Sequence, residues 1–330
     1  MKSLNKLVQI INLLADGNFH SGAVLAEQLS ISRTAVWKRI QSLQRRGLEI
    51  HAVRGHGYRL TQRVELLERD TLLTLIDKKV RPLLGTLTLH TEVKSTNQYL
   101  LDRINTPDFH GQVTLAEYQS AGRGRRGRRW HAPYAAGICL SLGWCFDPAP
   151  QPLTLVSLGA GNAVIRALRR IGIRDAGLKW PNDIYWQGRK LGGILVEARE
   201  ESAGPCRLVL GIGVNFCFPR SRYRDIDQPW VDIASIKKPF ISRHVFAAAL
   251  VSETLQLLSD MATRYNSGSE IVEEWRRHDH MSGKRARLIL PARIVDGRII
   301  GIDPVGALLM DIKGKVERFN AGEIRLKVQQ

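Results

Sequence analysis

The chain has 330 residues, which is more than one ordinary domain of about 100–200 residues. Lys and Arg total 49 against 31 Asp and Glu, a net charge of +18, and hydrophobic residues make up 44%. That apolar fraction excludes a largely disordered chain, and the 29 glycines follow no fixed period, which excludes a collagen-like chain. The charge favours a polyanionic partner such as nucleic acid, an anionic membrane or nucleotide phosphates, without choosing among them.

The cysteines and the N-terminus indicate a protein that stays in a reducing compartment. No cysteine pair has CxxC spacing or a neighbouring His pair, so small buried hydrophobes are expected at Cys139, Cys145, Cys206 and Cys217. The first twenty residues have a helical pattern with Lys2, Lys6 and Asp16 rather than an apolar signal-peptide core. No run reaches the roughly 18 apolar residues of a membrane span. We therefore expect a cytoplasmic protein with no membrane partner.

The first sixty residues predict three short helices followed by a hairpin. Ser21 is a good N-cap for the second helix, residues 30–32 are a short turn before the third, and Gly47 is placed to end the third. The expected inward positions are Leu4, Leu7, Ile11 and Leu14, then Val24, Leu25 and Leu29, then Val36, Ile40 and Leu43. Two short strands then flank the glycine-rich turn 54–57. This order of elements is a winged helix-turn-helix.

The third helix carries a basic face opposite its apolar one. Residues 1–62 contain nine Lys and Arg and three Asp and Glu, a surplus of six positive charges. In a helix-turn-helix the second helix lies in a DNA major groove, and the wing meets phosphate or the minor groove. The predicted DNA-binding residues are Ser32, Arg33, Thr34, Trp37, Lys38 and Arg54. The alternative is a three-helix module whose basic face is merely solvated.

Between about residues 70 and 278, helical stretches alternate with apolar β-type runs. Strands are predicted over 83–91, 112–118, 137–146, 192–198 and 207–216, and helices over 154–171 and 246–265. From about residue 280 the pattern becomes all-β, with a turn at Asp296-Gly297 between two strands and further turns at 303–306 and 313–314. We expect an α+β core large enough for a ligand cleft, followed by a small barrel-like module.

The most unusual segment is 117–130, in which five arginines lie between residues 123 and 129. Gly122, Gly124 and Gly127 satisfy G-x-G-x-x-G after a predicted strand. The following residues lack the apolar helical period that a dinucleotide-binding motif requires, so that function is rejected. One interpretation is a mobile loop whose glycines let backbone N–H groups approach phosphate and whose arginines neutralise charge. The alternative is a second nucleic-acid patch or a solvated loop.

Further motifs place polar side chains near the ends of predicted strands. The segment 179–183, Lys-Trp-Pro-Asn-Asp, combines a cation, a rigid turn, an amide and a carboxylate. Lys190 comes just before a buried strand, and Asn215 ends another. Ser95-Thr96-Asn97 lies at a strand-to-helix junction, where a plain N-cap is the competing explanation. Together these groups suit a site for a small polar acid and a nucleotide.

Through these motifs, taken in order with the helix-turn-helix, the chain resembles the bifunctional biotin–protein ligases and biotin operon repressors of bacteria. The arginine-glycine loop and the 179–183 segment are specific to that family, and the resemblance covers essentially the whole chain. It implies an α+β fold: a winged helix-turn-helix over residues 1–65, a central mixed-sheet domain like that of class II aminoacyl-tRNA synthetases over 66–279, and an SH3-like barrel over 280–330.

The resemblance also implies an activity, that of a biotin–[acetyl-CoA-carboxylase] ligase that uses ATP and Mg²⁺. Such an enzyme forms biotinoyl-5′-AMP and pyrophosphate, and then transfers biotin to one lysine of a biotin carboxyl carrier protein. The physical problem is to bring a carboxylate against an α-phosphate when both are negative. Positive groups must therefore already be in place.

Site residues follow from the matching positions of the family. The implied catalytic residues are Arg125, Lys179, Asp183 and Lys190, where Lys190 holds the biotin carboxylate and Asp183 positions the incoming amine or the metal. The implied biotin-binding residues are Ser95, Thr96, Asn97, Gln119, Arg123, Gly124, Arg125 and Lys190. The implied nucleotide-binding residues are Asn182, Asn215 and Trp230. Trp130 is expected to support the loop, and no metal ligand is assigned.

The resemblance further implies that biotinoyl-5′-AMP is a corepressor, which favours a homodimer whose two helix-turn-helix units reach two operator half-sites and repress biotin biosynthesis. One rival is a ligand-sensing transcription factor with a non-catalytic synthetase-like domain. The joint presence of Lys179, Asp183 and Lys190 argues against it. Another rival is a lipoate or other acyl ligase of similar fold, against which the arginine-glycine loop argues.

The sequence departs from the family pattern at three places. Residues 219–228 have no readable pattern, which leaves Trp230 as the only indication of an adenylate-covering role nearby. Lys327 stands where the family has an arginine, so an ATP contact there is not expected. Trp37 puts a bulky ring on the recognition helix, so a different operator preference is expected.

Overall fold

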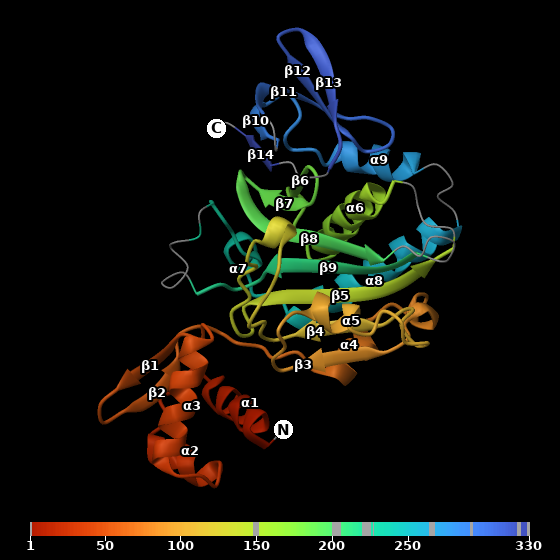
Figure 1. Cartoon of the computed structure of the whole chain (residues 1–330). Helices are drawn as coiled ribbons and strands as arrows, with labels where there is room; N and C mark the ends of the chain where they lie inside the picture. The colour runs from red at the N-terminus through yellow and green to blue at the C-terminus, as the bar shows by residue number, and fades with distance from the viewer. Residues whose placement is uncertain are drawn as a thin grey trace.

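The computed structural model describes residues 2–147, 152–199, 206–219, 226, 228–263, 268–290, 293–321 and 325–328. Figure 1 shows three parts: a helical N-terminal part, a central sheet with its helices, and a smaller sheet near the C-terminus. The α+β fold class predicted from the sequence is confirmed. The predicted boundaries between the three domains stay predictions, and the two apolar cores described below each cross one of them.

The N-terminal part folds as three helices and a two-stranded hairpin: α1 (Lys2–Leu14), α2 (Gly22–Gln28), α3 (Arg33–Arg45), β1 (Ile50–Val53) and β2 (Gly57–Leu60). Ser21 and Ser32 cap α2 and α3, because each side chain accepts a bond from a backbone N–H in the first turn. The predicted inward residues from Leu7 to Leu43 are buried, apart from Val24, and the side chain of Leu4 lies outside the described residues. Val24 is 42% exposed, since Leu25 and Leu29, one turn apart, set the buried face of this short helix.

The central part is a seven-stranded mixed sheet of order β3-β4-β5-β9-β8-β7-β6, in which only β3 and β4 run parallel. Its strands are β3 (Leu87–His90), β4 (Val113–Ala116), β5 (Gly137–Phe146), β6 (Gly177–Lys179), β7 (Asp183–Trp186), β8 (Arg189–Arg199) and β9 (Cys206–Asn215). The predicted strands are confirmed. The predicted run 83–91 is shortened at its start by a 3₁₀ turn, η1 (Arg81–Leu83). The short strands β6 and β7 were missed by sequence reasoning.

Helices cover both faces of this sheet. They are α4 (Arg69–Leu75), α5 (Thr96–Leu101), α6 (Thr154–Arg170), α7 (Ile233–Ile236), α8 (Arg243–Thr263) and α9 (Ser269–Arg277). The core residues Ile212 and Val214 of β9 face α6 and α8, whereas Val209 faces the other side and packs in a small cluster with Leu100 of α5. The segment Arg243–Thr263 is apolar and long enough to cross a membrane, but 72% of its most apolar window is buried inside the protein, as expected of a core helix.

The C-terminal part is a five-stranded antiparallel sheet of order β13-β12-β11-β10-β14. Its strands are β10 (Arg285–Ile289), β11 (Ile294–Ile302), β12 (Leu308–Ile312), β13 (Lys315–Phe319) and β14 (Arg325–Val328). The turn predicted at Asp296-Gly297 is wrong, because both residues lie within β11. Gly297 is needed for close approach: a Cβ there would lie 2.6 Å from the Asp311 carbonyl oxygen. The predicted turns at 303–306 and 313–314 are confirmed.

Two apolar cores hold the three parts together. One runs from the central sheet into the C-terminal sheet and includes Trp180, whose Nε1 donates to the Gly306 carbonyl at 3.0 Å. The other belongs to the N-terminal part but also takes in Tyr134 and Ala135, which precede β5. The N-terminal part is therefore packed against the segment that enters the central sheet.

Candidate active site and DNA-binding surface

Glycines in the strands leave room for other side chains on one face of the central sheet. A Cβ on Gly211 would lie 2.1 Å from Oδ1 of Asn97, and one on Gly213 would lie 2.5 Å from the ring of Trp130. Real Cβ atoms do not approach other atoms so closely, so only glycine lets these two side chains lie on the strands. Gly193 on the neighbouring strand lies beneath Trp130 and Lys190. The hydrogen-bonding groups predicted from scattered motifs thus lie on a floor of glycine-lined strands.

The arginine-glycine loop closes on itself above this floor. The Trp130 N–H donates to the Gly122 carbonyl at 2.8 Å, and the Gly124 N–H donates to the Arg128 carbonyl at 2.7 Å. Arg126 and Gly127 both have positive φ, which lets the chain reverse between the two arms. Only a 3₁₀ turn, η2 (Arg125–Gly127), lies here, and β5 is the next regular element. The rejection of a dinucleotide-binding helix is confirmed.

The loop, the glycine-lined strands and the 179–183 segment surround one cavity of about 920 Å³. All thirteen residues predicted for the ligase site line it: Ser95, Thr96, Asn97, Gln119, Arg123, Gly124, Arg125, Lys179, Asn182, Asp183, Lys190, Asn215 and Trp230. Among the described lining residues, nine are Lys or Arg and a single one, Asp183, is a carboxylate. The cavity is therefore strongly positive and suited to anions.

One end of the cavity is a buried polar cluster. The Thr96 N–H and Oγ1 lie 2.8 and 3.1 Å from Oε1 of Gln119. Ser141 Oγ lies 2.7 Å from Thr96 Oγ1 and 2.5 Å from Asn97 Oδ1. Ser95 caps α5. It is therefore both the predicted N-cap and a residue of the cavity wall. Buried polar groups that satisfy one another present a fixed pattern of donors and acceptors to a ligand.

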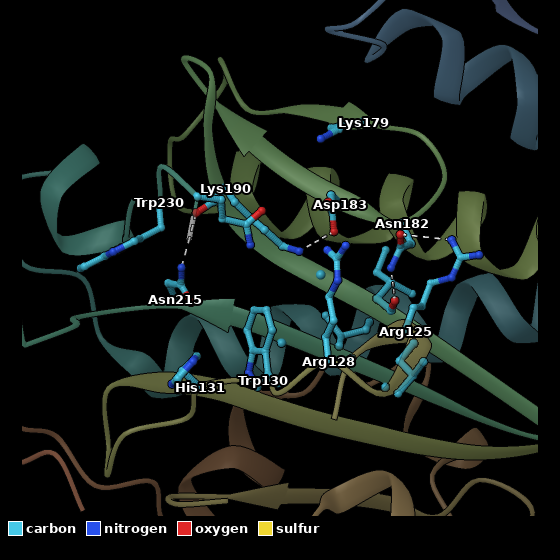
Figure 2. A pocket seen from close by; sticks show the side chains of 18 of the residues that line it. Arg125, Arg128, Trp130, His131, Lys179, Asn182, Asp183, Lys190, Asn215 and Trp230 are labelled. Atoms are coloured by element: carbon cyan, nitrogen blue, oxygen red, sulfur yellow. Dashed lines mark hydrogen bonds and ion pairs between the residues drawn. The ribbon is translucent and has the colours of Figure 1, made fainter. Parts of the chain in front are cut away.

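Cations are held in place in the middle of the cavity, as Figure 2 shows. Lys190 Nζ lies 2.6 Å from Asp183 Oδ1 and 6.0 Å from the centre of the Trp130 ring. Arg125 donates to Asn182 Oδ1 at 3.4 Å and also to the backbone carbonyl of Ala321. Burial lowers the pKa of Arg125, and the Asp183 charge opposes that shift, but a guanidinium stays protonated at neutral pH.

Backbone-anchored amides lie on either side of the Lys190–Asp183 pair, with Asn182 near Arg125 and Asn215 near Trp230 (Figure 2). Asn182 Nδ2 donates to the Ile194 carbonyl at 2.7 Å, and Asn215 Nδ2 donates to the Val231 carbonyl at 3.0 Å. Trp230 belongs to a segment bridged to Lys190, and its ring lies 5.4 Å from that of Phe218. Lys179 contacts Tyr185, with Nζ 3.3 Å from the hydroxyl.

Sequence reasoning missed several residues at this site. Arg128, predicted only as part of the charged loop, also lines the cavity, as do the unpredicted residues His131, Lys284, Arg285 and Leu326. The last three come from the C-terminal part, and no motif signalled that this part reaches the site. The arginines at 220, 222 and 224 lie outside the described residues, as does the side chain of Lys327.

The cysteines do not contribute a nucleophile. All four are free; Cys139 and Cys206 are buried as predicted, whereas Cys145 and Cys217 are only partly buried. Cys139 lies in the cavity wall, where burial raises the pKa of its thiol to about 12, and this keeps it protonated. Within the described residues, no group of three or more His, Cys, Asp or Glu side chains is arranged to hold a metal ion.

Comparison with known proteins identifies the family. Three family models match successive parts of the chain: an HTH domain over residues 4–59, the Biotin/lipoate A/B protein ligase family over 90–215, and the Biotin protein ligase C terminal domain over 281–327. The chain is 35% identical to the Bifunctional ligase/repressor BirA of Salmonella typhimurium and to that of Escherichia coli, over 99% of each chain. The chain belongs to the bifunctional ligase/repressor family.

One solved structure shares the fold of the ligase part of this chain. The biotin protein ligase from Aquifex aeolicus in complex with biotin and ATP matches with a TM-score of 0.63, covering 74% of this chain and 99% of that one at 24% identity. At that identity the match shows the fold alone. The resemblance read from the motifs is therefore confirmed by both sequence and fold.

The DNA-binding surface of a ligase/repressor is expected on α3 and the hairpin. Arg33, Thr34, Trp37 and Lys38 are exposed on α3, and Arg54 is exposed at the hairpin turn. Ser32 is exposed too, but its Oγ accepts from the Ala35 N–H at 3.1 Å, so it also serves as the helix cap. Figure 1 shows this N-terminal part at one end of the molecule, joined to the central sheet near the end of α3.

Proposed function

We propose that this chain activates biotin with ATP at the cavity described above and transfers it to a lysine of a biotin carboxyl carrier protein. The chain is a biotin ligase and a DNA-binding repressor by its family. The observation that carries the site assignment is the convergence of all thirteen predicted residues on one cavity with nine cations and one carboxylate. Two anions that repel each other can meet in such a cavity.

In the first step a carboxylate oxygen of biotin attacks the α-phosphorus of ATP, the anhydride bond of biotinoyl-5′-AMP forms and pyrophosphate leaves. Lys190 and Arg125 are the cations proposed to screen the two charges. Lys190 is held by Asp183 at 2.6 Å, and Arg125 by Asn182 at 3.4 Å. Their partners fix both cations before substrate arrives, and preorganised charge costs no reorganisation during the reaction.

The buried polar end is proposed to bind the ureido ring of biotin. Thr96, Asn97 and Gln119 are each at most 7% exposed, and their positions are fixed by bonds to one another and to Ser141. A ring that carries both N–H donors and a carbonyl acceptor suits amide and hydroxyl groups, which can play either role. Arg123 and Gly124, on the near arm of the loop, are proposed to close over it.

The rest of the cavity is proposed to bind the nucleotide. Asn182, Asn215 and Lys179 supply polar groups there, and Trp230 offers a ring on which adenine can stack. Mg²⁺ fits this site through the phosphates of ATP, because it is often held by one or two carboxylates plus substrate phosphates, and Asp183 is the carboxylate in the described cavity wall. When bound, the ion would neutralise charge on the leaving pyrophosphate.

In the second step the carrier lysine nitrogen attacks the acyl carbon, the amide bond forms, AMP leaves and the nitrogen loses a proton. Asp183 is proposed to position that amine, because it is the only carboxylate among the described lining residues. Once Lys190 is paired with the ligand, Asp183 would be able to accept a hydrogen bond from an ammonium or amine. The same residue thus serves both steps without moving far.

Repression is proposed to depend on biotinoyl-5′-AMP as corepressor, with a homodimer binding two operator half-sites. What supports this is the joining of an HTH domain and a ligase domain in one chain. Because its proposed partners are an operator and a carrier protein, the chain is proposed to act in the cytoplasm. The rival function, a sensor without catalysis, gives no reason for Lys179, Asp183 and Lys190 to lie together in the same cavity.

The deciding experiment is isotope exchange between pyrophosphate and ATP with purified protein and Mg²⁺. We expect exchange that requires biotin. Exchange with lipoate instead would assign the site to the lipoate branch of the matched ligase family, and no exchange with either acid would leave the sensor function.

A further inference from the structure

A large apolar side chain in the turn before α2 packs against the wing, which is the hairpin of β1 and β2. Phe19 is 36% exposed, whereas Leu14 at the end of α1 is fully buried. The centre of the Phe19 ring lies 4.6 Å from Cζ of Arg59 and 5.9 Å from the centre of the His56 ring. One partly exposed aromatic ring therefore contacts two basic side chains of the wing.

Backbone bonds fix this turn to the wing. The His20 N–H donates to the Tyr58 carbonyl, and the Tyr58 N–H donates to the His20 carbonyl, both at 2.9 Å. Gly57 is required for this close approach, because a Cβ there would lie 2.1 Å from the His20 carbonyl oxygen. The segment that carries Phe19 thus pairs with β2 like a short third strand, which gives its ring a fixed place beside the hairpin.

Stacking leaves the hydrogen-bonding edge of Arg59 available to another partner. A planar guanidinium that stacks on an aromatic ring uses its flat face, while its N–H groups point outward in the plane. Among the described residues, no acceptor bonds the Arg59 Nε, which is buried, so the ring rather than an acceptor holds this side chain. The donors on its two terminal nitrogens have the planar arrangement that matches a phosphate group.

His56 lies at the exposed tip of the same hairpin. Histidine changes its charge between pH 5 and 8, so His56 adds a positive charge to the wing as the pH falls through this range. The charged and titratable groups on the elements around it are Arg54, Arg59, His51 and the Asp16–His20 pair, whose atoms lie 3.0 Å apart. Asp16 is the one carboxylate among them and already bonds His20, so an external anion is the partner that favours protonation of His56.

We propose that Phe19 is a positioning residue for DNA binding, which holds Arg59 and His56 side by side so that both contact phosphates of the operator. Phe19 acts through these two side chains and does not itself touch the DNA. The wing of this fold meets phosphate or the minor groove, and phosphate contacts fix how a protein sits on DNA without reading its sequence. This inference rests on the proposed binding of an operator and is independent of the ligase reaction.

The test measures DNA binding by the full-length protein and starts with Phe19→Leu, which keeps an apolar side chain but removes the aromatic face. The probe is the duplex that wild-type protein selects from a random-sequence pool with biotin and ATP present. Phe19→Leu should weaken binding about threefold, the size of one exposed cation–π contact, whereas Phe19→Tyr keeps the ring and should bind like wild type. Val24→Ala, which shortens another exposed apolar side chain of the N-terminal part, is the matched control and should have no effect.

Salt and pH separate positioning from a merely structural role. Arg59→Gln should weaken binding about tenfold at pH 8 and lower the slope of log affinity against log salt by about 0.9, the value for one phosphate contact. His56→Gln should lower that slope by the same amount at pH 6 and leave it unchanged at pH 8, because only the protonated ring displaces a counterion. In Phe19→Leu the slope should rise less between pH 8 and pH 6 than in wild type, which a loss of stability alone would not produce.

The double variant at pH 8 decides whether Phe19 acts through Arg59. If it does, Phe19→Leu with Arg59→Gln binds no more weakly than Arg59→Gln alone. Additive losses, a Phe19→Leu protein that binds like wild type, or a Phe19→Tyr protein as weak as Phe19→Leu would each overturn the proposal. If wild-type protein selected no duplex, the proposed repression would fail, and affinity for an unselected duplex at low salt would still decide the role of Phe19, because phosphate contacts do not depend on sequence.

Discussion

The recognition helix and the arginine-glycine loop are both rich in cations, yet two of the loop arginines are held by side chains of the central part, whereas the other three are exposed. Arg33, Lys38 and Arg54 are exposed, and within the described part of the chain no ion pair holds them. In the loop, Arg123 is paired with Glu197 and Arg125 is tied to Asn182. Exposed, unpaired cations suit a large external polyanion that arrives with its own counterions. Cations fixed in a cavity suit a small anion that must be oriented.

The positive charges behind the net charge of +18 thus have different functions in the two regions. Substitutions can separate these functions. Removing a loop or cavity cation should reduce catalysis with little change in the salt dependence of operator binding. Removing a helix cation should do the reverse. The first three predictions below each change one side of this comparison, and the last changes the junction between the two parts.

The largest expected effect belongs to the cavity. Lys190→Ala removes the partner of Asp183, now 2.6 Å away, and the proposed partner of the biotin carboxylate. Pyrophosphate–ATP exchange should fall about 10²–10³-fold, as for the loss of one preorganised charge donor. The rate is measured with saturating biotin and ATP, and the urea midpoint checks folding. Lys315→Ala, an exposed lysine of β13, is the control. A normal rate would remove Lys190 from the mechanism.

On the other side of the comparison, Arg33→Gln with Lys38→Gln should weaken operator binding by about 2–3 kcal/mol, because two charged contacts are lost. The slope of log affinity against log salt should fall by about 2, roughly 1 for each phosphate contact. Titration of operator DNA at several salt concentrations measures both quantities. Lys78→Gln with Lys79→Gln, two exposed lysines of the central part, is the control. If biotin-dependent exchange fell in parallel with DNA binding, the two cation sets would not be separable.

Trp37 distinguishes base recognition from charge within the DNA-binding surface. Its side chain is 52% exposed on α3, where an apolar ring can contact the methyl group of thymine in the major groove. Trp37→Ala should cost about 1–3 kcal/mol at one base position and leave the salt slope unchanged. Replacing thymine by uracil in the operator removes that methyl group, so wild type should lose affinity where the variant does not. Equal losses for both proteins would show that Trp37 does not read thymine.

Local signals predicted the parts of this molecule that depend on neighbours in sequence. The N-caps Ser21 and Ser95, the buried face of α3 and the strand 137–146 were all predicted, because capping and periodicity act over a few residues. The site residues were found for a different reason: their motifs resemble those of a family, and the structure brings all thirteen to one cavity. Their individual roles stay predictions.

What the sequence could not predict depends on pairing between distant strands. Ser141 is one polar residue in an apolar strand, and its contacts with Thr96 and Asn97 join positions about 45 residues apart. Asp296-Gly297 carries a strong turn signal, but its glycine is required by the neighbouring strand instead. Lys284 and Arg285 reach the cavity only because the C-terminal sheet shares its core with the central one. Propensity is overridden in each case by tertiary contact.

The smallest expected effect lies where the two compared regions meet. Arg46, the residue after α3, lies 2.8 Å from Glu92 and 5.6 Å from the centre of the Tyr118 ring, next to the cavity residue Gln119. Arg46→Gln should lower the free energy of unfolding by about 1 kcal/mol, because a partly exposed ion pair and a cation–π contact are lost. Urea titration measures it, with the exposed neighbour Arg45→Gln as a control of equal charge. An equal loss in both variants would mean that the junction adds nothing specific. A fall in exchange rate with stability unchanged would show instead that the junction acts on the cavity and that the two cation sets are coupled through it.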